Sequence, residues 1–282
     1  MKKTVIAICY DFDKTLATKN MQEYSFIPNL GITTEEFWTR ANNFCKRHQC
    51  DLTLAYLRTM INECKKAGIK LTKEYLHGLG QDIEFFDGVE TWFKRLNKFA
   101  EKQGVKLEHY LISSGNLEII EGTPIFKEFT KAFGCEFLYD CNKEAYWPKN
   151  TVNYTLKTQY LFRICKGASD LTDEHTVNRK TPKKHVEFRN MIYVGDGVTD
   201  IPCMTLVKER GGVAISVYHN KSKENTFELI EDNRVNYVCK SNYKSGSSFE
   251  KLVKMIISSL ALKETLIQKE HTTKKINKKA GL

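Results

Sequence analysis

Acidic side chains follow two apolar runs of the sequence, at the point where each run ends. Asp11 and Asp13 come directly after the first run, in the sequence Asp-Phe-Asp-Lys-Thr-Leu. Asp196 and Asp200 follow a later run, in the sequence Gly-Asp-Gly-Val-Thr-Asp. Clustered carboxylates repel one another unless a cation balances them, and hard divalent cations prefer oxygen ligands. If the two runs are strands that end at one edge of a sheet, these four acids predict a cation site, and we expect Mg²⁺ there.

A third apolar run, residues 110–113, ends at Ser113, and Ser114 and Gly115 follow it. Hydroxyl and backbone N–H groups at a strand-to-helix turn bind anions. We therefore expect these three residues to hold an anion. An anion site beside acids and a divalent cation is typical of a site that handles phosphoryl groups.

Six short apolar runs must position these residues. The runs lack regular polar alternation, which is typical of strands buried on both faces of a parallel sheet. They cover residues 4–10, 110–113, 136–139, 191–194, 212–217 and 235–239. Helical patterns lie between most of them, and Asp87 and Ser247 each stand as a capping residue three positions before a glutamate. The alternation predicts an α/β fold with a parallel sheet, whose carboxyl edge carries the site.

One interval departs from this alternation. Between residues 19 and 86 the patterns are helical, as in the series Leu54, Leu57, Ile61 and Cys64, which Gly68 ends. We predict a discontinuous core of residues 1–18 and 87–282, with a helical domain of residues 19–86 inserted into it. Residues 166–189 are polar and predict a surface excursion with little regular structure.

In this order, the motifs resemble the phosphatase branch of the haloacid dehalogenase superfamily. The first motif of that family matches residues 11–15, the second matches the strand end at Ser113, and the last matches residues 195–200. The resemblance extends over nearly the whole chain. It implies a Rossmann-like core with a helical cap between the first and second motifs, where the helical interval lies.

The resemblance also implies roles for the acids. Asp11 would attack phosphorus and form an aspartyl-phosphate, and Asp13 would act as general acid and then general base. Mg²⁺ would be bound by Asp11, the Asp13 carbonyl and Asp196. Asp200 would orient a water molecule or supply a further ligand. The alternative for any one of these acids is a capping or turn residue, as for Asp200 before a helix start.

The same family uses a serine and a lysine to hold the phosphoryl oxygens. Ser113 would be that serine. Lys157, which starts a helical pattern upstream of the last motif, is our choice for the lysine, and Lys149 and Lys166 are the alternatives. Both groups would act where charge concentrates in the transition state.

The substrate implied is a small phosphorylated metabolite. Phosphoserine phosphatases in this superfamily place a Glu after the first motif and an Arg on a cap helix, and Glu23 and Arg58 are the candidates here. The alternative is that both are solvated helix-surface residues. The polar segment 166–189 and the long C-terminus also depart from a minimal enzyme of that type.

The charge balance leaves two other functions open. The 282 residues include 44 Lys and Arg against 34 Asp and Glu, a net charge of +10, and the last twenty residues hold six Lys against two Glu. A basic tail would suit a nucleic-acid end phosphatase or nucleotidase, although no aromatic residues interleave with these lysines. A non-enzymatic alternative is a binding module controlled by phosphorylation of an Asp, but such modules are shorter and lack a second Asp two positions on.

The cysteines and the N-terminus indicate the compartment. Nine cysteines without a Cys-x-x-Cys pair are typical of reduced thiols, and Cys45, His48 and Cys50 lack the second ligand pair of a zinc finger. The first apolar run ends too early for a signal peptide, and no run approaches the ~20 residues of a membrane span. We expect a soluble, cytoplasmic protein without a membrane partner.

Overall fold

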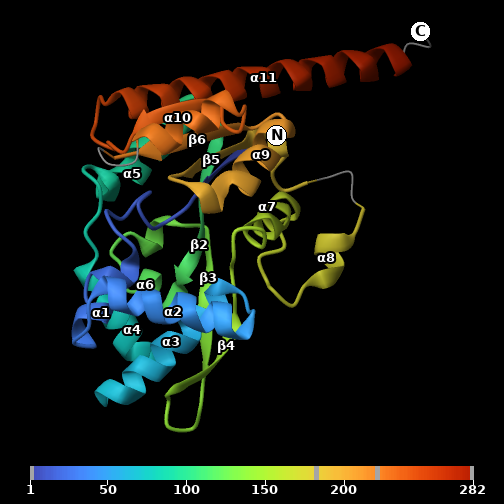
Figure 1. Cartoon of the computed structure of the whole chain (residues 1–282). Coiled ribbons are helices and arrows are strands. Elements are labelled where there is room, and N and C mark those ends of the chain that lie inside the picture. The colour runs from blue at the N-terminus through green and yellow to red at the C-terminus, as the bar shows by residue number, and fades with distance from the viewer. Residues whose placement is uncertain (1–2, 181–183, 220–222, 280–282) are drawn as a thin grey trace.

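A mixed sheet with helices on both faces forms the centre of the computed structural model (Figure 1), which describes residues 3–180, 184–219 and 223–279. Seven strands in these residues have the spatial order β4-β3-β2-β1-β5-β6-β7. Neighbouring strands are parallel, except that β4 is antiparallel to β3. The strands are β1 (Val5–Tyr10), β2 (Lys106–Asn116), β3 (Lys131–Tyr139), β4 (Ala145–Asn150), β5 (Met191–Gly195), β6 (Val213–Tyr218) and β7 (Tyr237–Lys240). The predicted α/β fold is confirmed.

The helices divide between the sheet and the interval after β1. Those before β2 are α1 (Phe26–Asn29), α2 (Thr34–His48), α3 (Leu52–Ala67), α4 (Lys73–Leu79) and α5 (Val89–Lys102). Those after β2 are α6 (Leu117–Glu121), α7 (Lys157–Lys166), α8 (Glu174–Asn178), α9 (Ile201–Glu209), α10 (Lys223–Glu231) and α11 (Ser248–Lys279). Helices α5 and α11 pack together on one side of the sheet, and α7 and α9 pack together on the other.

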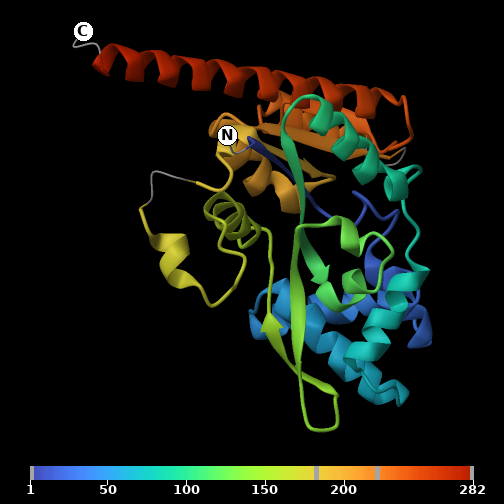
Figure 2. The same cartoon turned by 180° about the vertical axis from the view of Figure 1, so that it is seen from behind.

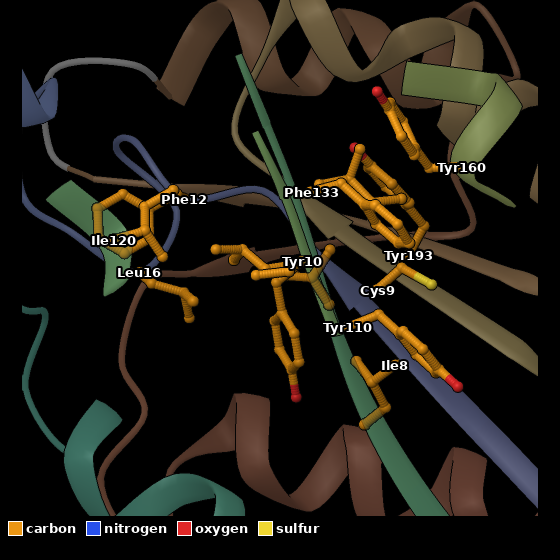
Figure 3. Packing of buried hydrophobic residues seen from close by; sticks show 14 of the residues in the cluster. Ile8, Cys9, Tyr10, Phe12, Leu16, Tyr110, Ile120, Phe133, Tyr160 and Tyr193 are labelled. Atoms are coloured by element: carbon orange, nitrogen blue, oxygen red, sulfur yellow. The ribbon is translucent and has the colours of Figure 1, made fainter. Parts of the chain in front are cut away.

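Strand β1 lies at the centre of the core, and all six of its residues are buried. Successive side chains of a strand point to opposite faces, and Figure 3 shows Tyr10 on one side and Cys9 on the other. The Tyr10 hydroxyl accepts a hydrogen bond from Trp92 Nε1 of α5 at 2.9 Å and lies 3.1 Å from His109 Nδ1. Burial on both faces explains why this strand has no polar alternation.

The register of the sheet brings the chemical motifs to one edge. Tyr10, the last residue of β1, pairs with Leu111 of β2 on one side and with Val194 of β5 on the other. The residues that follow β1 and β5, and the end of β2, therefore lie side by side at the carboxyl edge. Ligands of open α/β sheets bind at this edge.

Helices α1 to α4 form a group at the end of the molecule opposite α11, as both views show (Figures 1 and 2). Helix α4 contacts α6, which follows the second motif, and α3 contacts β4 of the β3–β4 hairpin. The Ala145 amide donates to the Leu71 carbonyl at 2.8 Å, and Thr72 forms a bridge with Glu144. The helical character of residues 19–86 is confirmed, and their separation as a domain stays a prediction.

Three local expectations need correction. Strand β3 begins at Lys131, not at residue 136, and strand β4 was not expected at all. Pro148 obscures β4 in the sequence, because proline is tolerated in strands only at sheet edges and bulges, and β4 is an edge strand. Asp87 does not cap α5. The N-cap is Gly88, whose φ of +89° suits glycine, and a Cβ there would lie 2.6 Å from the backbone of residues 243 and 244.

The C-terminal helix begins as expected, because the Glu250 amide donates to Ser247 Oγ at 3.1 Å. Arg189 Nε pairs with Glu264 of α11 at 2.7 Å and so connects the end of the polar segment to this helix. The side chains of Lys274, Lys275, Lys278 and Lys279 lie outside the described residues. No helix in the described part of the chain is long and apolar enough to cross a membrane.

Candidate active site

Three carboxylates converge where β1 and β5 end. Asp11, Asp196 and Asp200 each offer an oxygen atom, and these oxygens all lie within 4.8 Å of one another. Asp11 is 4% exposed and Asp200 is fully buried. The structure therefore brings together Asp11 and Asp200, which are 189 positions apart in the sequence, as their positions after two apolar runs predict.

Lys157 lies among these acids. It is the first residue of α7 and is 1% exposed, and its Nζ lies 2.6 Å from Asp11 Oδ1 and 2.8 Å from Asp200 Oδ1. The alternatives lie elsewhere: Lys149 pairs with Glu136 at the surface, and Lys166 donates to the Arg179 carbonyl. Of the three candidate lysines, the structure brings only Lys157 to the site.

Burial and mutual repulsion raise the pKa values of the acids of the site. Burial raises the pKa of Asp11, and Asp200 adds to the increase while Lys157 opposes it. Burial and the neighbouring Asp11 raise the pKa of Asp13 to about 8. Burial would lower the pKa of Lys157, but its two carboxylate partners outweigh burial and raise the pKa. A raised pKa favours the protonated form of Asp13, which a general acid requires.

The acids fit a divalent cation. Asp200 Oδ1 accepts from Lys157 and from the Tyr193 hydroxyl at 2.8 Å each, while its buried Oδ2 has no hydrogen-bond partner among the described residues. A side chain at Gly195 would collide with that carboxylate, so glycine permits its close approach. An unpartnered buried carboxylate oxygen beside two further carboxylates is a donor set for Mg²⁺.

The two serines of the second motif lie in different environments. Ser113 is fully buried, and its Oγ accepts from the Gly115 amide at 2.9 Å. Ser114 lines the cavity above the acids, and its buried Oγ has no partner among the described residues. Ser113 does not line the cavity, and its role in anion binding stays a prediction.

A cavity of about 750 Å³ opens above the carboxyl edge. Its floor includes Asp11, Asp13, Lys157 and Asp196, and residues from the interval 19–86 line the opposite side. Tyr56 of α3 joins the two sides, because its hydroxyl donates to the Ser114 carbonyl at 2.6 Å. The cavity is large enough for a small phosphorylated metabolite.

The structure separates the two candidates for substrate recognition. Glu23 lines the cavity, and its Oε1 accepts from Trp38 Nε1 at 3.3 Å. Arg58 is exposed and does not line the cavity, so the structure does not bring it to the site. On α3 it lies two residues, or about 200°, from Tyr56, which faces the cavity.

Several cavity residues escaped the sequence reasoning. Lys14 adopts a φ of +56° in the turn after Asp13 and lines the cavity. Trp38, Asp51 and Tyr154 line it as well. The one available signal was the position of Asp51 directly before a helical pattern, and its Oδ1 does accept from the Thr53 amide at 2.8 Å. The aromatic residues carried no signal, because aromatic residues at helical spacing are usual in cores.

No family model matches the chain. An uncharacterized protein of Borreliella burgdorferi is 26% identical over 291 residues, which cover 93% of this chain and 98% of that protein. A HAD-family hydrolase of Salmonella enterica serovar Typhi has a TM-score of 0.58 at 17% identity, over 89% of this chain and 70% of that one. A phosphoserine phosphatase in its apo form has a TM-score of 0.54 at 17% identity, over 86% of this chain and 96% of that one.

The chain has the haloacid dehalogenase fold. A probable phosphoserine phosphatase of Vibrio cholerae has a similar structure, with a TM-score of 0.58 at 14% identity over 92% of this chain and 65% of that one. In the haloacid dehalogenase fold of this chain, the ends of β1, β2 and β5 and the start of α7 supply the clustered side chains. Asp11, Asp13, Lys157 and Asp196 therefore line one cavity, together with Ser114 and Gly115 at the end of β2.

Proposed function

We propose that the protein is a Mg²⁺-dependent phosphomonoester hydrolase that acts on a small phosphorylated metabolite through an aspartyl-phosphate. The observation that carries this proposal is the placement of Asp11, Asp196 and Asp200 around the Lys157 ammonium at the floor of an open cavity. The similarity to phosphoserine phosphatases in fold supports it.

The residues divide the reaction into two steps. In the first, an Asp11 oxygen bonds to phosphorus, the bond between phosphorus and the ester oxygen breaks, and that oxygen takes the proton held by Asp13. In the second, a water oxygen bonds to phosphorus, Asp13 takes a proton from the water, and the bond to Asp11 breaks. The sum converts a phosphomonoester and water into an alcohol and phosphate, and both aspartates return to their initial states.

Other groups of the site orient the reacting carboxylates and the phosphate. Lys157 holds Asp11 in place and supplies positive charge beside the incoming phosphate, and Ser114 lines the cavity next to them. Asp11, Asp196 and Asp200 would hold Mg²⁺, whose charge offsets the repulsion between a carboxylate and a phosphate dianion. Asp13 accepts a hydrogen bond from the Met21 amide at 2.7 Å, which orients its carboxyl group toward the cavity.

Hydrolysis of p-nitrophenyl phosphate by the purified chain tests the proposal. We expect turnover with Mg²⁺, loss of turnover with a chelator, recovery when Mg²⁺ is restored, and no turnover by the variant Asp11→Asn. Activity that persists in chelator, or in Asp11→Asn, would contradict the proposal. A stable phosphoprotein without turnover would favour the phosphorylation-controlled binding module instead.

A further inference from the structure

Asp200 stands at a position where an aspartate normally caps a helix. It is the N-cap residue of α9, and the side chain of an N-cap aspartate usually accepts a hydrogen bond from an amide of the first turn. The Asp200 side chain makes no such bond. Its carboxylate instead contacts one group of β5 and one group of α7. Helix capping therefore does not account for this side chain.

The group of β5 is the hydroxyl of Tyr193, which donates to Asp200 Oδ1 at 2.8 Å. Tyr193 is fully buried, among the side chains drawn in Figure 3. Its backbone is fixed on both sides, because it pairs with Cys9 of β1 and with Ala214 of β6. Tyr193 is not one of the residues that line the cavity, so its effect on a bound ligand would pass through Asp200.

The two oxygens of Asp200 have different surroundings. Oδ1 accepts both hydrogen bonds, from Tyr193 and from the Lys157 ammonium at 2.8 Å. Oδ2 is buried and has no partner among the described residues. A buried polar atom without a partner is costly, because it loses its hydration and gains no hydrogen bond in return. Oδ2 is therefore the oxygen that a cation at this site would use.

The contacts of Asp200 differ in how firmly they hold the carboxylate. Lys157 carries its ammonium on a flexible four-carbon chain, and it also contacts Asp11 at 2.6 Å. The Tyr193 hydroxyl is carried on a rigid ring that starts from a central strand. On the other side of the carboxylate, a Cβ at Gly195 would lie 2.4 Å from Oδ2, so Oδ2 packs closely against Gly195. Tyr193 and Gly195 together thus restrict the carboxylate to one orientation.

We propose that Tyr193 is a positioning residue, whose hydroxyl holds the Asp200 carboxylate so that Oδ2 points at the proposed Mg²⁺ site. The inference rests on the proposed function. Groups that hydrogen-bond to a metal ligand orient that ligand and raise the affinity for the metal. Without the hydroxyl, Lys157 would be the remaining donor to Oδ1 among the described residues, and Asp200 would meet a cation in more than one orientation.

Binding of Mn²⁺, which takes the same oxygen ligands as Mg²⁺, tests the inference without turnover. Free Mn²⁺ gives an electron paramagnetic resonance signal that is lost on binding, and the signal therefore yields Kd. Tyr193→Phe removes the hydroxyl and keeps the ring. We expect Kd for Mn²⁺ to rise about tenfold in this variant, as for the loss of other groups that orient a metal ligand.

The hydrolysis of p-nitrophenyl phosphate gives a second readout. In Tyr193→Phe, the Mg²⁺ concentration for half-maximal rate should rise about tenfold, while kcat at saturating Mg²⁺ stays within about threefold of the unaltered protein. A purely structural role of the hydroxyl would not produce this separation, because general damage to the site lowers kcat at every Mg²⁺ concentration.

Tyr110→Phe is the matched control. Tyr110 is 5% exposed, and its hydroxyl donates to the buried Glu108 at 2.7 Å, on a carboxylate that also pairs with Lys106. The variant therefore loses a hydrogen bond of the same kind at a carboxylate that does not line the cavity. Its Kd for Mn²⁺ should equal that of the unaltered protein.

A double variant shows whether Tyr193 acts through Asp200. Asp200→Ala removes the carboxylate that the hydroxyl positions and should itself weaken Mn²⁺ binding. Adding Tyr193→Phe to Asp200→Ala should then leave Kd unchanged, because two residues that act through one contact are not additive. A further rise in Kd would show that Tyr193 acts by another route and would overturn the inference.

The other outcomes separate the inference from the proposed function. An unchanged Kd in Tyr193→Phe, or an equal rise in Tyr110→Phe, would overturn the inference. If the unaltered protein still binds Mn²⁺ and hydrolyses p-nitrophenyl phosphate, the proposed function stands. Failure of the unaltered protein to bind Mn²⁺ and to hydrolyse any phosphomonoester would overturn the proposed function and the inference with it.

Discussion

The buried ion pairs of Lys157 allow a quantitative test of the site. Lys157 Nζ lies 2.6 Å from Asp11 and 2.8 Å from Asp200, and all three side chains are at most 6% exposed. At an effective dielectric constant of about 20, each attraction amounts to about 6 kcal/mol, and the lost hydration of the charges offsets much of it. Lys157→Met would leave two buried carboxylates without their cation. We expect the free energy of unfolding to fall by about 3–5 kcal/mol.

Lys149→Met is the matched control. Lys149 Nζ lies 2.6 Å from Glu136, the same distance, but the Lys149 side chain is 51% exposed. Its loss should cost less than about 1 kcal/mol, because water screens exposed pairs. Urea unfolding followed by circular dichroism, in buffer without divalent cations, measures both. Equal losses in the two variants would refute the view that the acids of the site depend on Lys157.

Three further predictions test other parts of the site and core. Ser114→Ala should lower kcat/KM for p-nitrophenyl phosphate about tenfold and Ser113→Ala should lower it less, since of the two serines Ser114 lines the cavity and Ser113 does not; the reverse order would contradict this assignment. Asp13→Asn should slow ethyl phosphate about 100-fold more than p-nitrophenyl phosphate, whose leaving group needs no proton, and equal slowing would exclude Asp13 as general acid. Burial lowers the pKa of His109 to about 3. Below pH ~6.5 the unfolded chain therefore binds a proton at His109 that the native protein does not bind. The free energy of unfolding should consequently fall by about 1.4 kcal/mol per pH unit between pH ~6.5 and pH 3. His109→Gln should remove that part of the slope in urea unfolding at pH 7.5, 6 and 5, and an identical slope would show that His109 is not held neutral.

The sequence predicts the parts of this fold that depend on local patterns. The buried runs before Asp11 and Asp196 are strands β1 and β5, because continuous apolar residues can be satisfied only by burial on both faces. The positions of the acids follow from the strand ends alone, because the carboxyl ends of parallel strands lie at the same edge of the sheet. Lys157 is found in the same way, as the first residue of a helix.

The features that the sequence did not reveal depend on tertiary contacts. Which of two adjacent serines faces the cavity depends on the phase of β2, and the apolar run alone does not give that phase. Gly88 replaces Asp87 as the cap because the backbone of residues 243 and 244 passes close by, a contact that lies far away in the sequence. Trp38 and Tyr56 face the cavity only because α2 and α3 pack over the carboxyl edge.

Direct detection of the covalent intermediate tests the central claim, that Asp11 accepts the phosphoryl group. The protein is mixed with substrate and Mg²⁺, quenched in acid within the first turnover and reduced with borohydride, which converts an aspartyl-phosphate to homoserine. Peptide mass spectrometry then locates the modified residue. We expect homoserine in place of Asp11 and nowhere else. Turnover of the substrate without modification of Asp11, or with modification at another residue, would contradict the claim.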